Sequence, residues 1–432
     1  MKFGFTQEII TPIPSEVYLD GYGFRLTHAK GVHDDIYCKV CVMSDGEHMN
    51  AIVVFDICGF GDRVYNTVIS HIHSVTGIPE ENISLCATHT HASMAAGILA
   101  GVPVNDILWN FVGEKAAYTV KRAMDSMEEC KILVSQGKKL ESMYNRRSLD
   151  DSCDRRVFVL SFINIEGSLK GAIVSASCHA VVRTDMQISA DFPGMLTREA
   201  EKKYPGVPFI YLQSRGGDAN PKFMGELDID TLCEKLGGEL AESALEAVCG
   251  GAEVKAETLK SACSRIEIPV EDYPDEETLK AKLKASCDIC HSTDNKVQKR
   301  VAGAEILWYN EVIGHVRQGN INRPVEIKLQ VIRLGDDIVF AFLPFEVLYC
   351  TANDLEKEFV KRGYKNENIF IIGYSNSVKG YLAPKAYLPK YMPDTRWSYE
   401  VIDAPIWYNI PLYCEDTEKT VTDEIINLYD IN

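Results

Sequence analysis

Strand-like and helix-like runs alternate along the chain of 432 residues, and this alternation constrains the fold more than any other feature. Residues 51–55 are apolar and rich in β-branched side chains, as expected for a buried strand, and residues 62–75 have the pattern of a helix. A second strand-like run at 83–87 leads directly into Thr88-His89-Thr90-His91. Residues 156–165 and 169–177 are typical of a hairpin. The alternation predicts an α/β fold.

No internal repeat, low-complexity segment or flexible linker divides the chain, so we expect one large domain over residues 1–432. Residues 106–130 predict a long amphipathic helix. The stretch 272–300 is the most polar and lysine-rich part of the chain and predicts an exposed helical insertion. Residues 375–410 are irregular and rich in tyrosine and proline, and a segment of this length usually serves a function or packs over another part of the protein.

The charge balance limits the partners that the protein can have. Its 62 acidic and 45 basic residues give a net charge of −17, which repels phosphate backbones and argues against nucleic acid and against anionic membranes. No apolar run reaches the roughly 18 residues of a membrane-spanning helix, and the N-terminus has no apolar signal-peptide core. We therefore expect a cytoplasmic protein without a membrane anchor, and an oligomer is compatible with the sequence.

Fourteen cysteines are scattered along the chain, and without an export signal we expect reduced thiols. Two Cys-x-x-Cys pairs occur, Cys38/Cys41 and Cys287/Cys290, and the second continues to His291 in the pattern of a c-type haem attachment site. Haem attachment normally follows export, and a zinc ribbon split between the pairs is an alternative. Because Cys38 and Cys41 stand at an odd spacing in a strand-like run, they face opposite ways. We favour unrelated core or surface cysteines.

Four chemistry-bearing residues each stand just past the end of a predicted strand: His89, His179, Asp218 and Glu346. In α/β proteins the carboxyl ends of strands are where sites are built. The sequence therefore predicts that segments far apart in the chain meet at one edge of the fold.

His89 and His91 are the first candidates for a metal site. In an extended backbone, residues two apart face the same way, so both imidazoles can point into one cavity. Neutral imidazole is the commonest nitrogen ligand of zinc, and catalytic zinc sites use about three protein ligands plus a water. Two surface or capping histidines are the alternative.

Three further segments carry candidate groups. His179 follows an apolar strand, and the helix start after Asp191 can place that carboxylate near the imidazole; a core histidine is the alternative. Arg146 can clamp a carboxylate or polarise a carbonyl, or can be a solvated charge. Glu346 can complete a site of two histidines and one carboxylate, or can favour the dipole of the following helix.

At these residues the chain resembles the neutral ceramidase family, through its N-terminal catalytic domain. The resemblance rests on collinear motifs: Gly21-Tyr22-Gly23, Phe55-Asp56, Thr88-His89-Thr90-His91, Asn145-Arg146, Cys178-His179-Ala180, Ser189-Ala190-Asp191-Phe192-Pro193-Gly194, Gln213 to Pro221, Pro344-Phe345-Glu346, and Gly380-Tyr381 through Tyr399-Glu400. It implies a mixed β-sheet core flanked by helices and a zinc amidase activity. It also implies that His89, His179, Glu346 and Tyr381 bind Zn²⁺, and that His91, Arg146 and Tyr399 contact substrate or assist the chemistry.

The chain departs from the family at three points. Asn220 replaces the functional serine of the family's Gly-Asp-Val-Ser-Pro motif, Phe345 replaces a glycine before Glu346, and the family's export signal and C-terminal immunoglobulin-like domain have no counterpart here. These differences favour a smaller, more polar amide or ester substrate over ceramide.

The resulting hypothesis is hydrolysis of an amide, or of an ester, by a metal-activated water. Arg146 and the zinc would stabilise the oxyanion, His91 would carry a proton to the leaving group, and Asp191 would orient His179. Asn220 would still donate a hydrogen bond through its amide. The alternatives are a catalytically inactive metal- or ligand-binding homologue, and a metal-dependent lactonase or phosphoesterase.

Overall fold

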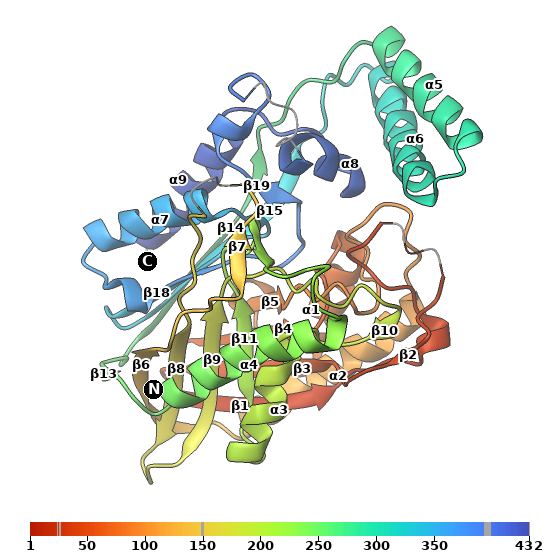
Figure 1. Ribbon diagram of the computed structural model, residues 1–432. Helices are drawn as coiled ribbons and strands as arrows, with labels where there is room; N and C mark the ends of the chain where they lie inside the picture. Colours follow the sequence, from red (N-terminus) through yellow and green to blue (C-terminus); the bar gives the residue numbers. More distant parts are fainter. Residues whose placement is uncertain (24, 26, 148–150, 393–398, 432) are drawn as a thin grey trace.

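Two β-sheets form the centre of the protein in the computed structural model, which describes residues 1–431 except 24, 26, 148–150 and 393–398 (Figure 1). The first sheet consists of β1 (Lys2–Ile9), β3 (Tyr37–Ser44), β4 (Met49–Phe55), β5 (Ile83–Ala87), β6 (Glu128–Gln136), β8 (Phe158–Asn164), β9 (Leu169–Ala176), β11 (Phe209–Gln213) and β13 (Ala252–Val254). Its order is β11-β9-β8-β6-β1-β3-β4-β5, with β13 paired to β6. The pairs β4–β5 and β9–β11 are parallel and the other pairs antiparallel, so the mixed sheet that the resemblance implied is confirmed.

A second sheet has the order β14-β15-β16-β18. Its strands are β14 (Leu259–Ile268), β15 (Val325–Leu334), β16 (Ile338–Phe342) and β18 (Ile369–Ile372), of which β16 and β18 are parallel. Three short pairs complete the strands of the described residues: β2 (Gly31–Val32) with β10 (Gln187–Ile188), β7 (Met143–Asn145) with β12 (Ala219–Pro221), and β17 (Glu346–Val347) with β19 (Tyr381–Leu382).

Nine helices occur in the described residues, and most of them cover the outer faces of the two sheets. They are α1 (Asp62–Thr76), α2 (Asp106–Asp125), α3 (Pro193–Lys203), α4 (Ile229–Ala247), α5 (Glu276–Ser292), α6 (Lys296–Arg317), α7 (Tyr349–Lys361), α8 (Ala404–Trp407) and α9 (Thr417–Asp430), and a π-helical turn, Tyr399–Asp403, precedes α8. One apolar core lies between the first sheet and α1 and α2, and another between that sheet and α3 and α4. A third fills the space between the sheets, and a fourth lies between the second sheet and α7 and α9. The result is a four-layer arrangement of helices, sheet, sheet and helices.

Period-two alternation explains why the first sheet can be buried on both faces. Val40 and Val53 face α1 and α2, whereas Cys41 and Ile52 face the second sheet. Cys38 and Cys41 likewise fall into different cores, as their odd spacing predicted. Neither of them joins a cluster of metal-ligating groups with Cys287 or Cys290, which lie on α5, in the part of the chain that is described.

Helix boundaries follow the capping residues. Asn105 accepts a hydrogen bond from the backbone of Leu108 at the start of α2, and Asp228 does the same for Thr231 in α4. The prediction of one helix over 106–130 is wrong at its end. The helix stops at Asp125, and Glu128–Gln136 forms β6, because pairing with β1 and β8 outweighs the amphipathic pattern of the last residues.

The polar stretch 272–300 contains α5 and the start of α6, which pack together as a hairpin that stands out from the body of the protein (Figure 1). The hairpin continues to Arg317 and is therefore longer than the segment singled out in the sequence. No helix in the described residues combines the length and the apolar character needed to cross a membrane.

A buried ionic network joins α7 to the edge of the first sheet. Glu356 of α7 accepts two hydrogen bonds from Arg156, each of 2.8 Å, and one from Arg215, while Asp154 lies between the same two guanidinium groups. Arg215 is 1% exposed and Glu356 4%. Burial would raise the pKa of Glu356, but Arg156 and Arg215 hold it below its ordinary value. Its contribution to stability is therefore present above the unfolded pKa, about 4.3, and is lost as the pH falls through the lower folded pKa.

Replacing Glu356 by alanine is expected to lower the free energy of unfolding by about 3–5 kcal/mol, because the buried guanidinium of Arg215 and the partly buried one of Arg156 lose their shared acceptor. Urea-induced unfolding at neutral pH measures the change. The control Glu242→Ala removes an exposed partner of Lys138 and should leave stability nearly unchanged. Equal losses in the two variants would contradict the assignment.

Candidate metal centre

The candidate residues follow the ends of three pairs of parallel strands and lie together. His89 follows β5 and Cys58 follows its neighbour β4; His179 follows β9 and Gly216 follows its neighbour β11. In the second sheet, Glu346 follows β16, whose parallel neighbour is β18. A helix connects each pair of strands, and parallel strands so connected end at the same edge. The site therefore forms where the carboxyl ends of both sheets meet.

The imidazoles of His89 and His179 are fixed by backbone carbonyl groups. Nδ1 of His89 lies 2.6 Å from the carbonyl oxygen of Cys58, and Nδ1 of His179 lies 2.5 Å from that of Gly216. Because a carbonyl oxygen only accepts, each Nδ1 carries the proton and donates it. Each Nε2 is then left with a lone pair. No pattern in the sequence points to these two acceptors, because any residue supplies a backbone carbonyl.

Both lone pairs point at the carboxylate of Glu346. Its Oε2 lies 3.1 Å from Nε2 of His89 and 2.8 Å from Nε2 of His179, and all three side chains are at most 2% exposed. With both protons on Nδ1, no hydrogen can bridge these atoms, and Oε2 indeed has no hydrogen-bond partner among the described residues. Burial, together with Arg146, lowers the pKa of His179 to about 4, so this imidazole is neutral at pH 7. Three electron-pair donors thus converge without a proton, and a divalent cation fits them.

Tyr381 stands beside this cluster. It is the register partner of Glu346 in the β17–β19 pair, and its hydroxyl lies 3.5 Å from Nε2 of His179. Burial, and the nearby Glu346, raise the pKa of Tyr381 well above its ordinary value, so the phenol is protonated without a metal. Tyr381 is therefore placed to be a fourth donor, through its phenol oxygen.

Arg146 is held next to Tyr381 by several acceptors. Nη2 donates to the Tyr381 hydroxyl at 3.2 Å and to the Gly217 carbonyl at 2.9 Å, while Nη1 donates to Oδ1 of Asn220 at 3.2 Å. Burial opposes its charge, but Tyr381 and Glu400 raise its pKa well above the ordinary value, so it stays cationic. The structure thus brings Asn220, the replacement of the family's serine, into contact with Arg146.

Glu400 has a structural role that the sequence did not reveal. It is 1% exposed, and its Oε1 accepts from Nη2 of Arg146 at 3.0 Å and from Nε of Arg147 at 2.7 Å. One carboxylate oxygen thus holds two adjacent guanidinium groups. The adjoining Tyr399 is 36% exposed, and its ring lies 5.9 Å from that of Tyr381, at the outer side of the cluster.

His91 lies against the inner cluster. Its Nε2 is 3.1 Å from Nε2 of His89, and Nδ1 has no hydrogen-bond partner in the described residues. Burial, with His89 and His179, holds its pKa well below the ordinary value. A Cβ on Gly21 would lie 2.3 Å from the His91 ring, and Gly21 has φ +85°, so a glycine is required beside this imidazole.

Two expectations about this site are wrong. His89 is not extended: its φ of +63° is left-handed, so the two imidazoles meet through a turn and not through strand alternation. Asp191 does not orient His179. Its carboxylate instead accepts from the backbone N–H groups of Arg183 at 2.7 Å and Phe192 at 2.6 Å, and Gly216 takes the place expected for it.

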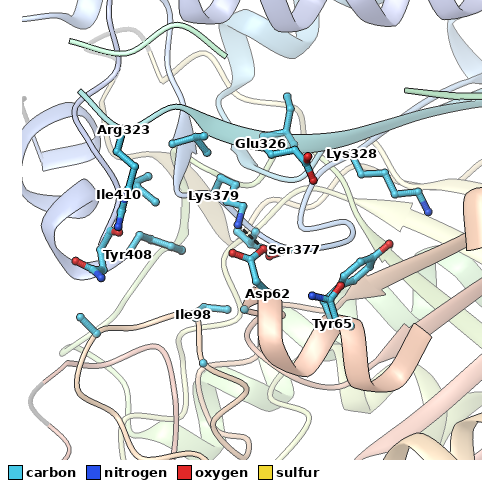
Figure 2. Close-up of a pocket in the computed structure, with 18 of the residues that line it drawn as sticks. Asp62, Tyr65, Ile98, Arg323, Glu326, Lys328, Ser377, Lys379, Tyr408 and Ile410 are labelled. Atoms are coloured by element: carbon cyan, nitrogen blue, oxygen red, sulfur yellow. Dashed lines mark hydrogen bonds and ion pairs between the residues drawn. The ribbon is translucent and has the colours of Figure 1, made fainter. Parts of the chain in front are cut away.

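Tyr408 is a further neighbour that the sequence did not point to. Its hydroxyl donates a hydrogen bond to Oε1 of Glu346, which leaves Oε2 facing the histidines. Tyr408 also lines a cavity whose lining includes none of the candidate metal ligands (Figure 2). Tyr408 thus orients Glu346 and belongs both to the candidate metal centre and to that cavity.

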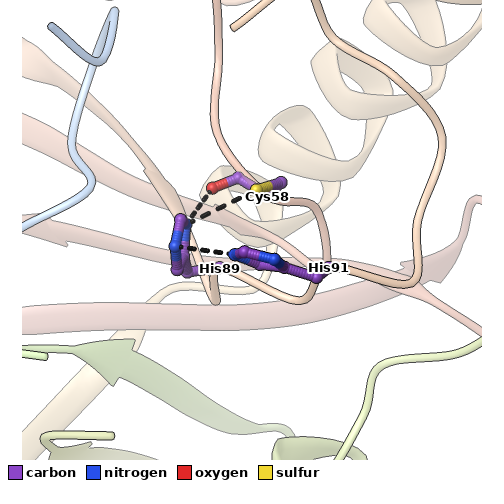
Figure 3. A group of neighbouring side chains, drawn as sticks. All are labelled: Cys58, His89 and His91. Atoms are coloured by element: carbon purple, nitrogen blue, oxygen red, sulfur yellow. Dashed lines mark hydrogen bonds between the residues drawn. The ribbon is translucent and has the colours of Figure 1, made fainter. Parts of the chain in front are cut away.

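Cys58, His89 and His91 form a second group with metal-ligand spacing (Figure 3). The geometry argues against a second ion, because Nδ1 of His89 already donates to the Cys58 carbonyl. Burial, and the nearby Asp20, raise the pKa of the Cys58 thiol well above its ordinary value, so the thiolate that a metal needs is disfavoured.

Comparisons with known proteins identify the family and the fold. The family model for neutral/alkaline non-lysosomal ceramidase, N-terminal, matches residues 2–268. The neutral ceramidase of Pseudomonas aeruginosa is 22% identical over 246 residues, which are 51% of this chain and 37% of that protein. The chain therefore spans little more than a third of that relative's length.

Two solved structures share the fold. The crystal structure of neutral ceramidase from P. aeruginosa has a TM-score of 0.75 at 18% identity, over 99% of this chain and 73% of that one. A structure described as ceramidase complexed with C2 has a TM-score of 0.75 at 17% identity, over 99% of this chain and 74% of that one. Since the family model covers more than half of the sequence, the predicted relationship is confirmed: the chain belongs to the neutral/alkaline non-lysosomal ceramidase family.

Proposed function

We propose that the protein is a metal-dependent hydrolase that cleaves an amide bond, with Zn²⁺ held by His89, His179, Glu346 and Tyr381. The observation that carries the proposal is the convergence of two unprotonated imidazole nitrogens and one carboxylate oxygen in a buried space, with no hydrogen between them. Such a set is costly to bury unless a cation neutralises it. Nitrogen and oxygen donors of this kind suit zinc.

A zinc ion in this place would supply a more acidic bound water and would polarise a carbonyl group. Arg146 would act on the oxyanion. Glu400, Gly217 and Tyr381 accept hydrogen bonds from Nε and Nη2, and Asn220 accepts one from Nη1. The second hydrogen of Nη1 has no partner among the described residues. A fixed cation with a spare donor is suited to stabilise developing negative charge.

His91 would move the proton. Because burial keeps its imidazole neutral at pH 7, it can accept a proton and pass it to a leaving amine. Its Nδ1 faces Gly21 and has no hydrogen-bond partner among the described residues, so this nitrogen is free to gain or lose a proton. Tyr399, partly exposed on the outer side of the cluster, would contact the substrate.

For the substrate we propose a small or polar amide, with an ester as the next choice. The names of the related proteins refer to ceramide, whereas this chain has Asn220 where the family has a serine, and that amide is engaged with Arg146. The same contact argues against the inactive-homologue alternative, since Asn220 supports Arg146 and does not displace it. All fourteen cysteines are free thiols, which supports a reducing compartment such as the cytoplasm.

The metal assignment is tested by measuring zinc content. His89→Ala and His179→Ala should each lose the ion, because two remaining strong donors do not hold it. Inductively coupled plasma mass spectrometry should find about one zinc per wild-type chain. The control His291→Ala removes an exposed histidine on α5 and should keep full zinc. Zinc retained in both site variants would refute the centre.

The roles of Arg146 and Glu400 are tested by turnover. Arg146→Lys keeps the charge but loses the planar fork, so kcat should fall by about 10²–10³-fold; Glu400→Gln only loosens Arg146 and should cost about 10–100-fold. Amide, ester, lactone and phosphate-ester substrates are compared at fixed zinc content. The control Arg198→Lys alters an exposed side chain.

The proposal is supported if amides are turned over and if Arg146→Lys loses more activity than Glu400→Gln. Turnover confined to lactones or phosphate esters would identify the alternative hydrolases. Full zinc without any turnover would favour the inactive homologue.

A further inference from the structure

A cavity of about 670 Å³ is lined in part by Tyr408, whose hydroxyl donates to Glu346 of the candidate metal centre. The first turn of α1, the loop around Ile98, the start of β15 and the segment around Lys379 line it (Figure 2). Its volume is within the range of small-molecule sites, roughly 300–1,000 Å³.

The charge of the lining differs from that of the whole chain. Four basic side chains, Arg265, Arg323, Lys328 and Lys379, face the cavity against two acidic ones, Asp62 and Glu326. The protein as a whole carries −17. A local excess of positive charge in an acidic protein attracts anions to this place.

Lys328 is the group that most needs a counter-ion. The residue is 5% exposed, and its Nζ donates to the backbone carbonyls of Glu80 at 2.7 Å and Ile83 at 2.9 Å. Within the described residues it forms no ion pair with a carboxylate. Burial lowers its pKa to about 8, so at pH 7 most molecules carry a buried ammonium, which two carbonyl dipoles and the charges of Glu80 and Glu81 stabilise without a direct ion pair. An ammonium has three donors, and two are used.

Tyr65 and Arg265 add donors to the same end of the cavity. The Tyr65 residue is 3% exposed, and its hydroxyl has no acceptor for its proton among the described residues, while Arg265 is near enough to donate to its oxygen. Tyr65, Arg265 and Lys328 all line the cavity, and the charge of Arg265 acts on Lys328. The ion-pair partner of Arg265, Glu326, is 3.3 Å away, and both side chains are exposed, so water screens this pair and the guanidinium can also bind a ligand.

We propose that this end of the cavity binds a small anion, a carboxylate or a phosphate, through the Lys328 ammonium, the Tyr65 hydroxyl and the Arg265 guanidinium. An anion there would neutralise a buried charge and satisfy two unused donors at once. The two chemistries have different sources. A carboxylate is a product of amide hydrolysis, whereas a phosphate would come from another metabolite.

Tyr408, which donates to Glu346, lines the opposite end of the same cavity (Figure 2). The anion site is therefore separate from the candidate metal centre. The binding itself does not require metal or hydrolysis, so it can be tested separately from the proposed function.

Isothermal titration calorimetry with inorganic phosphate and, in a second series, with acetate tests the site. The wild-type protein is expected to bind one of them saturably. Lys328→Met and Tyr65→Phe should each weaken that binding at least about tenfold, which corresponds to ~1.4 kcal/mol. The control Lys131→Met removes an exposed lysine on β6 and should bind as the wild type does.

Phosphate can also bind a metal, so His179→Ala is titrated in parallel, and an unchanged Kd there places the anion outside the metal centre. Circular dichroism establishes that the variants are folded; if Lys328→Met is not, Tyr65→Phe decides. The proposal is overturned if neither anion binds the wild type, if Tyr65→Phe and Lys328→Met bind as tightly as the wild type, or if His179→Ala abolishes binding.

Discussion

Two hydrogen bonds from imidazole Nδ1 atoms to backbone carbonyl oxygens determine what the centre of this protein can do. The carbonyl oxygens of Cys58 and Gly216 accept these bonds and so hold the protons of His89 and His179 on Nδ1. The opposite tautomer would let either Nε2 donate to Glu346, and the cluster would be a closed hydrogen-bonded network. As it stands, His89, His179 and Glu346 turn lone pairs toward one another with no hydrogen among the three, and the chemistry of the cluster follows from that polarity.

The carbonyl groups are well placed because each belongs to the strand next to the one that carries the histidine. Parallel pairing of β4 with β5, and of β9 with β11, sets the two strand ends side by side. The second sheet joins at the same edge: the backbone N–H of Ala87 donates to Tyr374, and that of Asn376 donates to Leu85. His89, Tyr374 and Asn376 all have left-handed backbone angles there. Strain of this kind persists only where the surroundings fix it, and it is common at functional sites.

Much of this could be predicted from the sequence, because strand ends are local features. Apolar runs stopping at His89, at His179 and before Glu346 indicated where the chain would turn, and collinear motifs added Tyr381, Arg146 and Tyr399. The two-sheet layering could not be predicted, since strands buried on both faces look alike whichever layer covers them. Three features depend on tertiary placement: the carbonyl partners of the histidines, the hydrogen bond from Arg146 to Glu400, and the contact of Tyr408 with Glu346. Asp191 was misassigned for a related reason: its carboxylate satisfies nearby backbone N–H groups, an option that any aspartate in a tight loop has.

The division of the donors between the two sheets has a consequence for biosynthesis. Both histidines and Arg146 belong to the part of the chain that builds the first sheet, whereas Glu346 and Tyr381 come more than a hundred residues after Gly216. A nascent chain emerging from the ribosome would present two imidazoles long before the carboxylate and the phenol exist. Ion capture would then be a late event of maturation, tied to the docking of the second sheet, and a stalled or shortened translation product would leave the ribosome with an incomplete site.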